Sequence, residues 1–370
     1  MRRAAVYAWS FIFRVTREDT LNTSSTLVRC LVAISLAVLW PLFPATASDG
    51  RLNIYSATDT SAMQTVLDAF LSRYPDVNVV YTEYNTRELH KAIVDGDIED
   101  ADIVISSSVD LQVDLVNRGL ARRIDPARDV TMPRWASWRS ELFGFTFEPV
   151  VTVYNKKAFE TLELPATRSA LALAIRDNPA FFNNAIGTYD IALSGVGYLF
   201  AAQDIEKGYQ FWRLVESFGR AGTATFCCTS LVLDKVAKGE LVLGYNVIGS
   251  YAAERARLDP RIGIAAFSDY TLVLSRSAFV HQSAPNPEAA RIFIEYLLSR
   301  EGQAKIAESS ALISIIEALE TDSDRMAIFG NPEAMQPIKI GPSLIGYLDR
   351  LKQTQVLADW RDTIDPHGTE

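Results

Sequence analysis

The sequence predicts an α/β fold built as two lobes joined by a two-strand hinge. Short apolar segments rich in Val and Ile alternate with segments whose apolar residues recur at helical spacing. This alternation is typical of a mostly parallel sheet covered by helices. Two long extended segments, 142–155 and 262–276, interrupt it. The 323 residues after position 47 also exceed what one hydrophobic core usually holds, so two lobes are expected.

The first lobe is expected to start with a β-α-β-α-β-α series. Strand 52–55 leads into a helix that places Met63, Val66 and Phe70 on one face, with Thr60 or Ser61 as N-cap. Pro75 ends that helix. We expect the next elements to be a strand at 77–84, a helix at 87–94 closed by Gly96, a strand at 101–106, and a helix capped by Asp110 that ends at Gly119.

The second lobe is expected to be a separate α/β block. Its predicted elements are a helix at 170–176, a strand at 188–193, a helix from about Tyr198, a helix at 229–238 capped by Thr229 or Ser230, and a strand at 241–246. After the second extended segment, Asn286-Pro287 opens another helix, and the C-terminal part is helical again.

These blocks give the expected lobe boundaries. Lobe one holds 50–147 and 272–370, and lobe two holds 152–262. The crossings at 148–151 and 263–271 form the hinge, since hinges absorb dihedral change at the ends of elements.

Residues 1–47 are expected to be a signal peptide. Arg29 precedes an apolar run from Cys30 to Phe43, and Ala45, Thr46 and Ala47 supply a small-x-small cleavage site. The run is shorter than the roughly 20 residues of a membrane span. Glu18 and Asp19 are unusual in such a segment, so a translation start near Leu27 and an uncleaved anchor stay open as alternatives. The localisation expected is the periplasm.

Charge and cysteine content exclude several classes of protein. Without residues 1–47, which hold five arginines and two acidic residues, the formal net charge is about −12. This balance argues against a nucleic-acid binder and against a membrane-surface protein.

The remaining cysteines, Cys227 and Cys228, are adjacent and cannot form a disulfide framework. We expect two buried thiols, with a strained vicinal disulfide as the alternative.

Hydroxyl-rich stretches follow several predicted strands. They are YSATDTS (55–61), SSSVD (106–110), LSGVGY (193–198) and YNVIGSY (245–251), with CCTS (227–230) at a helix start. Ligands in α/β sheets bind beyond the carboxyl ends of strands, and helix N-termini favour anions. Helix capping explains any single stretch, but several of them in both lobes predict a cleft that binds an anion.

Catalytic signatures are absent from the sequence. There is no HExxH, GxSxG or CxxC motif, and His90, His281 and His367 are scattered. Glu148 and Asp269 lie in the hinge crossings, where they are expected to accept structural hydrogen bonds. We expect no enzymatic activity, no cofactor and no bound metal. If the protein were an enzyme, Cys228 at a helix start would be the only candidate nucleophile.

Five segments resemble the periplasmic solute-binding proteins of ATP-driven (ABC) importers, type II fold. They are 52–81, 101–121, 151–159, 236–252 and 269–303, and the resemblance is nearest to the iron(III)-type subgroup. It implies capture of a solute between two lobes, a monomeric protein, and delivery to an ABC permease and its ATPase subunits. Ferric members of the subgroup use tandem tyrosines, whereas here Tyr245 is followed by Asn246. This departure argues against iron, which prefers anionic oxygens, and favours a phosphorylated or carboxylated organic solute.

The resemblance also implies a set of ligand-binding residues. Lobe one would contribute Ser56, Thr58, Asp59, Ser106 and Ser107; lobe two would contribute Ser194, Gly195, Gly197, Tyr198, Thr229, Tyr245 and Asn246; the hinge would contribute Asp269 and Tyr270. Two alternatives stay open: a ferric carrier that uses Tyr245 or Tyr251, and a sensory protein that presents its ligand to a membrane histidine kinase.

Overall fold

The structure is a computed structural model that describes residues 50–127, 131–308, 311–316 and 324–365. Residues 48–370 form one compact unit, to which the following description applies. The expected signal segment at 1–47 lies outside the described residues. Within the described ranges no helix combines the length and the apolar character needed to cross a membrane.

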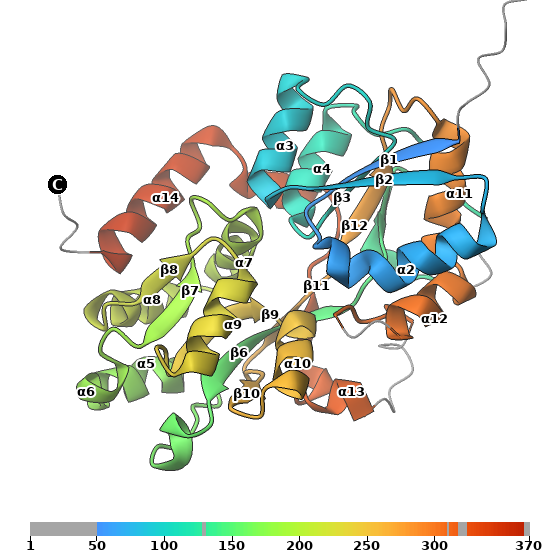
Figure 1. Cartoon of the computed structure of the whole chain (residues 1–370). Helices are drawn as coiled ribbons and strands as arrows, with labels where there is room; N and C mark the ends of the chain where they lie inside the picture. Colours follow the sequence, from blue (N-terminus) through green and yellow to red (C-terminus); the bar gives the residue numbers. More distant parts are fainter. Residues whose placement is uncertain (1–49, 128–130, 309–310, 317–323, 366–370) are drawn as a thin grey trace, which may run out of the picture. The chain divides into compact units, whose positions relative to one another are not determined.

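The first sheet has six strands in the order β2-β1-β3-β12-β5-β4. β1 lies parallel to β2 and β3, and β12 is antiparallel to β3 (Figure 1). The strands are β1 (Arg51–Ser56), β2 (Asn78–Glu83), β3 (Ile103–Ser106), β4 (Ser137–Trp138), β5 (Leu142–Gly144) and β12 (Ser277–Val280). Its helices are α2 (Thr60–Arg73), α3 (Thr86–Asp95), α4 (Val109–Asn117), α11 (Pro287–Leu298) and α12 (Arg300–Glu308). The predicted β-α series is confirmed here.

The second sheet has seven strands, in the order β13-β11-β6-β9-β7-β8 with β10 paired to β6. The strands are β6 (Glu148–Asn155), β7 (Ile186–Tyr189), β8 (Ala224–Phe226), β9 (Leu243–Ile248), β10 (Ile262–Ala265), β11 (Thr271–Leu274) and β13 (Met335–Pro337). The helices are α5 (Arg168–Asp177), α6 (Pro179–Phe182), α7 (Gly195–Glu206), α8 (Gln210–Arg220), α9 (Thr229–Lys238), α10 (Gly249–Leu258), α13 (Asp324–Ala327) and α14 (Arg350–Ile364). Short 3-10 turns lie at Arg134–Ala136, Ala158–Glu160, Pro332–Ala334 and Pro342–Tyr347 (η4).

Two strands of the second sheet carry the chain between the sheets. β6 follows β5, β11 precedes β12, and β6 and β11 form an antiparallel pair. The expected crossing 148–151 lies at the start of β6, whereas most of the expected crossing 263–271 covers β10 and the loop after it, with only Thr271 in β11. The hinge itself stays a prediction. Pro149 lies in the first extended segment, 142–155, and pairs with Val273 inside the ladder. A proline is tolerated there because it is the second residue of its strand.

The C-terminal helix α14 does not lie where the expected lobe division places it. The other lobe boundaries stay predictions. Residues 272–370 were assigned to lobe one, yet α14 packs on α8 of the second sheet. The Trp360 ring stacks on Phe211 at 6.2 Å between centroids. Gly219 leaves room for the backbone of Thr363 to approach α8.

Several helices begin one or two residues earlier than expected. Asp59 is the N-cap of α2, Ser108 the N-cap of α4 and Cys228 the N-cap of α9. Helix α7 starts at Gly195, because the Ser194 hydroxyl accepts the N–H of Gly197 at 3.1 Å and closes the first turn. These starts place the helix N-termini nearer to the strand ends.

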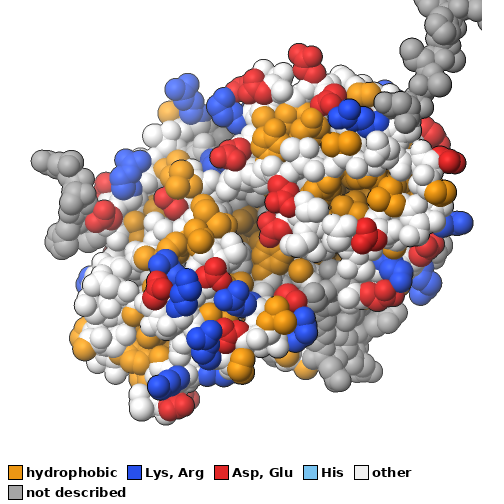
Figure 2. Space-filling view, viewed as in Figure 1, with side chains coloured by type: hydrophobic (Ala, Val, Ile, Leu, Met, Phe, Trp, Pro, Cys, Tyr) orange, Lys and Arg blue, Asp and Glu red, His pale blue; other side chains and the backbone are white. Residues whose placement is uncertain are grey.

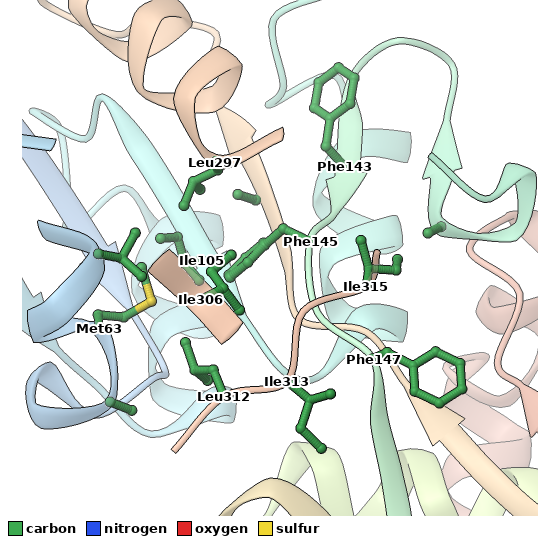
Figure 3. Packing of buried hydrophobic residues seen from close by; sticks show 14 of the residues in the cluster. Met63, Ile105, Phe143, Phe145, Phe147, Leu297, Ile306, Leu312, Ile313 and Ile315 are labelled. Carbon is green, nitrogen blue, oxygen red and sulfur yellow. The ribbon is translucent and has the colours of Figure 1, made fainter. Parts of the chain in front are cut away.

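The largest apolar cluster joins helices and strands of both sheets. Figure 3 shows Phe145 directed toward Ile105 and Ile306, on the segment that leads from β5 to β6. Phe145 and Ile306 are fully buried. The segment from β5 to β6 is therefore anchored in the core. Its backbone dihedral angles can change only at its two ends.

The visible surface carries both charge signs. On the face in Figure 2, acidic and basic side chains are interspersed, including over α9 and α10. Lys235 pairs with Glu240 and Arg255 pairs with Asp234 there. The expectation against a nucleic-acid binder rests on the acidic balance of the sequence, and this face shows no uniformly basic surface.

Candidate ligand-binding site

A small cavity of about 120 Å³ lies where helices of both sheets begin. Its walls include the N-cap residues of α2, α3, α7, α9 and α10, which are Asp59, Asn85, Ser194, Cys228 and Ile248. The first N–H groups of a helix have no partner within the helix, and the N-terminus carries partial positive charge. The cavity therefore collects backbone donors and a positive potential from five helices.

The wall from the first sheet is built by the ends of β1, β2 and β3. Asp59 and Ser107, two of the predicted site residues, line the cavity with Tyr84 and Thr86. Asn85 and Glu88 form a reciprocal capping box at the start of α3. Because this box fixes the first turn, the N–H groups of α3 keep their direction toward the cavity.

Three further predicted residues lie behind this wall. The Ser56 hydroxyl accepts the hydroxyl of Tyr81 at 2.7 Å, and Ser106 accepts the N–H of Ser108 at 3.1 Å. The Thr58 hydroxyl accepts Arg276 Nη1 at 2.9 Å. Ser56, Thr58 and Ser106 are fully buried and support the loops that carry the lining residues.

Arg276, between β11 and β12, lines the cavity and is almost completely buried. Its Nε donates to Glu148 Oε1 at 2.6 Å, and its guanidinium lies 4.8 Å from the centre of the Tyr251 ring. Burial alone would lower the pKa of Arg276, but its neighbours Glu148, Tyr251 and Asp59 together outweigh burial and raise it. The cavity floor therefore holds a permanent cation.

The wall from the second sheet carries two predicted residues, Ser194 and Thr229. The Thr229 hydroxyl is hydrogen-bonded to the hydroxyl of Tyr189. Gly197 lies behind them, where a Cβ would collide with Tyr189. Glycine at this position therefore allows α7 to begin against β7.

Gly195 joins the two walls. Its N–H donates to the Thr86 hydroxyl at 2.9 Å. A Cβ on Gly195 would lie 2.8 Å from Thr86 Oγ1 and 2.9 Å from Ser108 Oγ. Close by, Arg87 Nη2 donates to the backbone oxygen of Ile191 at 3.0 Å. These contacts close the cavity between the two sheets.

Tyr251, near the start of α10, adds a buried hydroxyl to the cavity wall. Within the described ranges this hydroxyl has no hydrogen bond of good geometry. Burial raises the pKa of Tyr251 to about 12, while the neighbouring Arg276 and the backbone N–H of Asp59 lower it in part. The side chain is a neutral phenol with spare hydrogen-bonding capacity.

A second group of predicted residues lies elsewhere, around Asp204 of α7. Its members are Tyr245, Asn246, Asp269 and Tyr270. The Asp204 carboxylate accepts Tyr245 at 2.9 Å and Tyr270 at 2.7 Å, and Arg168 Nη1 donates to Asp269 at 3.0 Å. Arg168, Asp204, Asp269 and Tyr270 line a different cavity, of about 370 Å³. Burial raises the pKa of Tyr245 well above its ordinary value.

Tyr198 is also turned away from the small cavity. Its hydroxyl donates to the backbone oxygen of Tyr347 at 2.5 Å, and its ring belongs to the core beneath α7.

The two cysteines differ from expectation as well. Cys227 and Cys228 are partly exposed and line the small cavity, so the prediction of two buried thiols is wrong.

Sequence reasoning missed several lining residues, above all Tyr84, Asn85, Thr86, Tyr189 and Arg276, and it named Tyr251 only for the ferric alternative. One signal was present in the sequence. Asn85 followed by Glu88 after a strand is a capping-box pattern, and it could have added this turn to the site. Nothing local marks Arg276, because its partner Glu148 is 128 residues away.

Within the described ranges, no group of three or more His, Cys, Asp or Glu residues is placed to hold a metal ion. The arrangement instead offers neutral hydrogen-bond donors, helix N-termini and one buried guanidinium. Such a set can bind the oxygens of a phosphate or carboxylate group.

Comparison with known proteins agrees with this fold. A substrate-binding protein of an ABC transporter from Agrobacterium tumefaciens is 34% identical, with a TM-score of 0.77 over 86% of this chain and 96% of that one. Iron-bound HitA from Pseudomonas aeruginosa is 18% identical (TM-score 0.63; 85% and 99% covered). AfuA from Actinobacillus pleuropneumoniae with fructose-6-phosphate bound is 14% identical (TM-score 0.65; 85% and 98% covered).

None of the curated proteins matches the chain. The family model of the bacterial extracellular solute-binding proteins matches residues 56–304. The fold is that of the type II periplasmic binding proteins, whose members are not enzymes, and the family implies a periplasmic location. The chain belongs to the bacterial extracellular solute-binding proteins that serve ABC transporters.

Proposed function

We propose that this protein captures a small anionic organic solute, phosphorylated or carboxylated, in the cavity between its lobes and delivers it to an ABC permease. The observation that carries the proposal is the convergence of five helix N-caps and the Arg276 guanidinium on one cavity. Each N-terminus stabilises an anion by roughly 0.3–1 kcal/mol when exposed and by more when buried.

The chemistry of the walls supports an anion over ferric iron. Helix N-termini and Arg276 repel a trivalent cation. Burial raises the pKa of Tyr251 to about 12 and that of Tyr189 further, so the phenols in the wall are neutral. Asn246, where ferric relatives would have a second tyrosine, has φ of 55°. Asparagine adopts that left-handed conformation more readily than tyrosine does.

The volume of the cavity requires a change in lobe separation. About 120 Å³ is the share of some four water molecules in liquid, well below the 300–1,000 Å³ of ligand pockets. A sugar phosphate would therefore bind to a more open form and close the lobes over itself. The strand pair β6 and β11 is the proposed hinge, and the contacts at Gly195 are proposed as part of the closed state.

Within this proposal, the lining residues have distinct roles. The N–H of Gly195 already donates to Thr86, and that of Gly197 to Ser194. The anionic group is therefore bound by the N–H of Val196 and by the N–H groups at the start of α9, beside the Arg276 guanidinium.

The Asp59 carboxylate accepts hydrogen bonds from hydroxyl groups in the remaining part of the solute. The Asn85 amide can both accept hydrogen bonds from these hydroxyl groups and donate to them.

Thermal melting against a small set of compounds tests the proposal. The set holds sugar phosphates, phosphoglycerates, phosphonates, dicarboxylates and ferric citrate. A ligand at 100 times its dissociation constant adds about 2.7 kcal/mol to the free energy of unfolding. We expect the anionic organic compounds alone to raise Tm.

Ser194→Ala should remove this shift, because it frees the first turn of α7. Thr167→Ala is the matched control: Thr167 caps α5 through the N–H of Ala170 at 3.1 Å and does not line the cavity. Equal loss of the ligand shift in both variants, or a response to ferric citrate alone, would contradict the proposal.

A further inference from the structure

We propose that Cys227 and Cys228 form a reversible vicinal disulfide in the cavity wall, and that this bond tightens solute binding. The effect on binding rests on the proposed function, whereas the bond itself does not. A dithiol pair at this place makes the solute site responsive to the redox state of the exported compartment.

The positions of the two sulfur atoms are the first argument. The Sγ atoms lie 2.7 Å apart, closer than two thiols in ordinary contact. Both side chains are partly exposed and both line the cavity. The backbone that holds them therefore needs little movement to accept a covalent bond.

The position of the pair in the fold is the second argument. Cys227 follows β8, and Cys228 is the N-cap of α9, with φ of −153° and ψ of 155°. The Cys228 side chain accepts no backbone N–H of the helix it caps, unlike Ser194 at the start of α7, and its Sγ accepts the Ser230 hydroxyl, at 3.7 Å. The start of α9 therefore lacks the side-chain bond that usually fixes a first turn, and a disulfide would supply the missing constraint.

The reaction is a thiol–disulfide exchange with a disulfide-bearing oxidant of the exported compartment. Burial raises the pKa of Cys227 to about 11, so Cys228 attacks first. Its thiolate bonds to one sulfur of the oxidant and the other sulfur leaves as a thiolate. Cys227 then loses its proton and attacks Cys228 Sγ, which expels the oxidant's first sulfur. Two thiols become one disulfide, and the oxidant gains two electrons and two protons.

Neighbouring cysteines favour a bond that forms and breaks. A trans peptide fixes their Cα atoms about 3.8 Å apart, whereas unstrained disulfides usually span about 4.4–6.8 Å. Strain makes a disulfide easier to reduce, and such bonds are typically the labile or regulatory ones. We therefore expect a bond that responds to mild reductants.

The bond would act on the site through the first turn of α9. The Thr229 hydroxyl is held by Tyr189, and Ser230 also lines the cavity. Fixing the N-cap in the conformation described here aims the N–H groups of that turn at the solute before it arrives. Because less freedom is then lost on binding, the oxidised form should bind about threefold or more tightly than the reduced form.

The first experiment detects the bond without any ligand. The purified full chain is incubated with oxidised glutathione, quenched in acid and alkylated with N-ethylmaleimide, and the peptide containing Cys227 and Cys228 is weighed. We expect an unlabelled peptide two hydrogen masses below the dithiol form, which becomes doubly labelled after mild dithiothreitol. A doubly labelled or glutathione-bound peptide without reductant would overturn the proposal.

The second experiment measures the effect on binding. Calorimetric titrations with inorganic phosphate and 3-phosphoglycerate compare oxidised and reduced protein. The control is the Cys227→Ser/Cys228→Ser double variant, whose dissociation constants should not change when reductant is added. Equal dissociation constants in both redox states overturn the effect on binding. If none of the organic anions of the melting set binds either form, the proposed function fails, while the alkylation experiment still tests the disulfide.

Discussion

At the residue scale, the buried ion pair between Arg276 and Glu148 holds the cavity floor in place. Glu148 is completely buried, and its second oxygen accepts the Ser250 hydroxyl. This carboxylate, at the start of the first expected crossing, is bonded to Arg276, which follows the second expected crossing. The expectation that Glu148 is a structural acceptor agrees with these bonds.

Replacing Glu148 should destabilise the protein strongly. Glu148→Leu leaves the Arg276 charge buried without its anion, which costs about 3–5 kcal/mol of unfolding free energy. Urea denaturation measures it. Glu288→Leu, which breaks the exposed pair with Arg291, is the control and should cost at most about 1 kcal/mol. Equal losses in both variants would contradict this account.

His281 should make stability depend on pH. Burial lowers its pKa from 6.5, and its Nδ1 accepts the N–H of Ser283, so the folded state holds the neutral ring. The unfolded state therefore takes up a proton first. Stability is unaffected above pH 6.5 and falls as pH drops below 6.5 toward the lower folded pKa.

Denaturation midpoints between pH 7 and pH 5.5 measure this dependence. His281→Gln cannot titrate and should show a flatter profile over that window. A profile that stays as steep as in the parent protein would assign the dependence to other groups.

At the element scale, the helix starts govern the site. The sequence predicted the alternation of strands and helices because apolar spacing is a local signal. It misplaced several N-caps, since Asp59 and Cys228 were passed over for neighbouring hydroxyl residues. The strand expected at 188–193 ends at Tyr189, because the Asp190 carboxylate accepts the N–H of Ala192 at 2.8 Å and turns the chain.

The same limits explain which site residues were predictable. Ser107, Ser194 and Thr229 lie where strand ends meet helix starts, a rule that needs only the sequence. Tyr245 was expected near the end of a strand at 241–246, but it lies inside β9. Asp204 draws its hydroxyl group, together with that of Tyr270, into a separate buried network. That outcome depends on contacts between distant segments, which periodicity does not report.

Gly195 should be required for closure of α7 onto α3 and α4. In Gly195→Ala the new methyl would lie 2.8 Å from Thr86 Oγ1 and 2.8 Å from Leu111 Cδ1. We expect binding of the best compound in the melting set to weaken by about tenfold or more, because the closed form is disfavoured. Gly346→Ala is the control, since nothing lies within 4 Å of its added Cβ.

Titration calorimetry measures the affinity, and small-angle X-ray scattering reports whether ligand still compacts the variant. Unchanged affinity and compaction in Gly195→Ala would mean that the contacts at Gly195 are not part of closure.

At the scale of the whole molecule, the chain reaches the second sheet three separate times: through the segment from β6 to β11, through β13, and through α14. η4 packs on α4 beside the first sheet, and α14 then packs on α8. Sequence pattern alone placed this last segment with the first lobe, because helical periodicity gives no information about which surface a helix covers.

Removing the anchor of α14 should destabilise the helices of the second sheet. Trp360 is 7% exposed, and Trp360→Ala should cost about 3–5 kcal/mol. Leu351, on the same helix, is 82% exposed, and Leu351→Ala should change stability by less than about 0.5 kcal/mol. Urea midpoints that fail to separate the two variants would show that α14 does not contribute to the fold in this way.

The central claim is that the small cavity binds the anionic group of an organic solute. Calorimetric titration with two matched pairs of compounds tests it: fructose 6-phosphate against fructose, and 3-phosphoglycerate against glycerol. We expect an anionic member to bind and its uncharged counterpart not to bind, and we expect Ser194→Ala to weaken binding about tenfold or more while Thr167→Ala does not. Binding of ferric citrate with a visible colour, and of none of the organic anions, would contradict it.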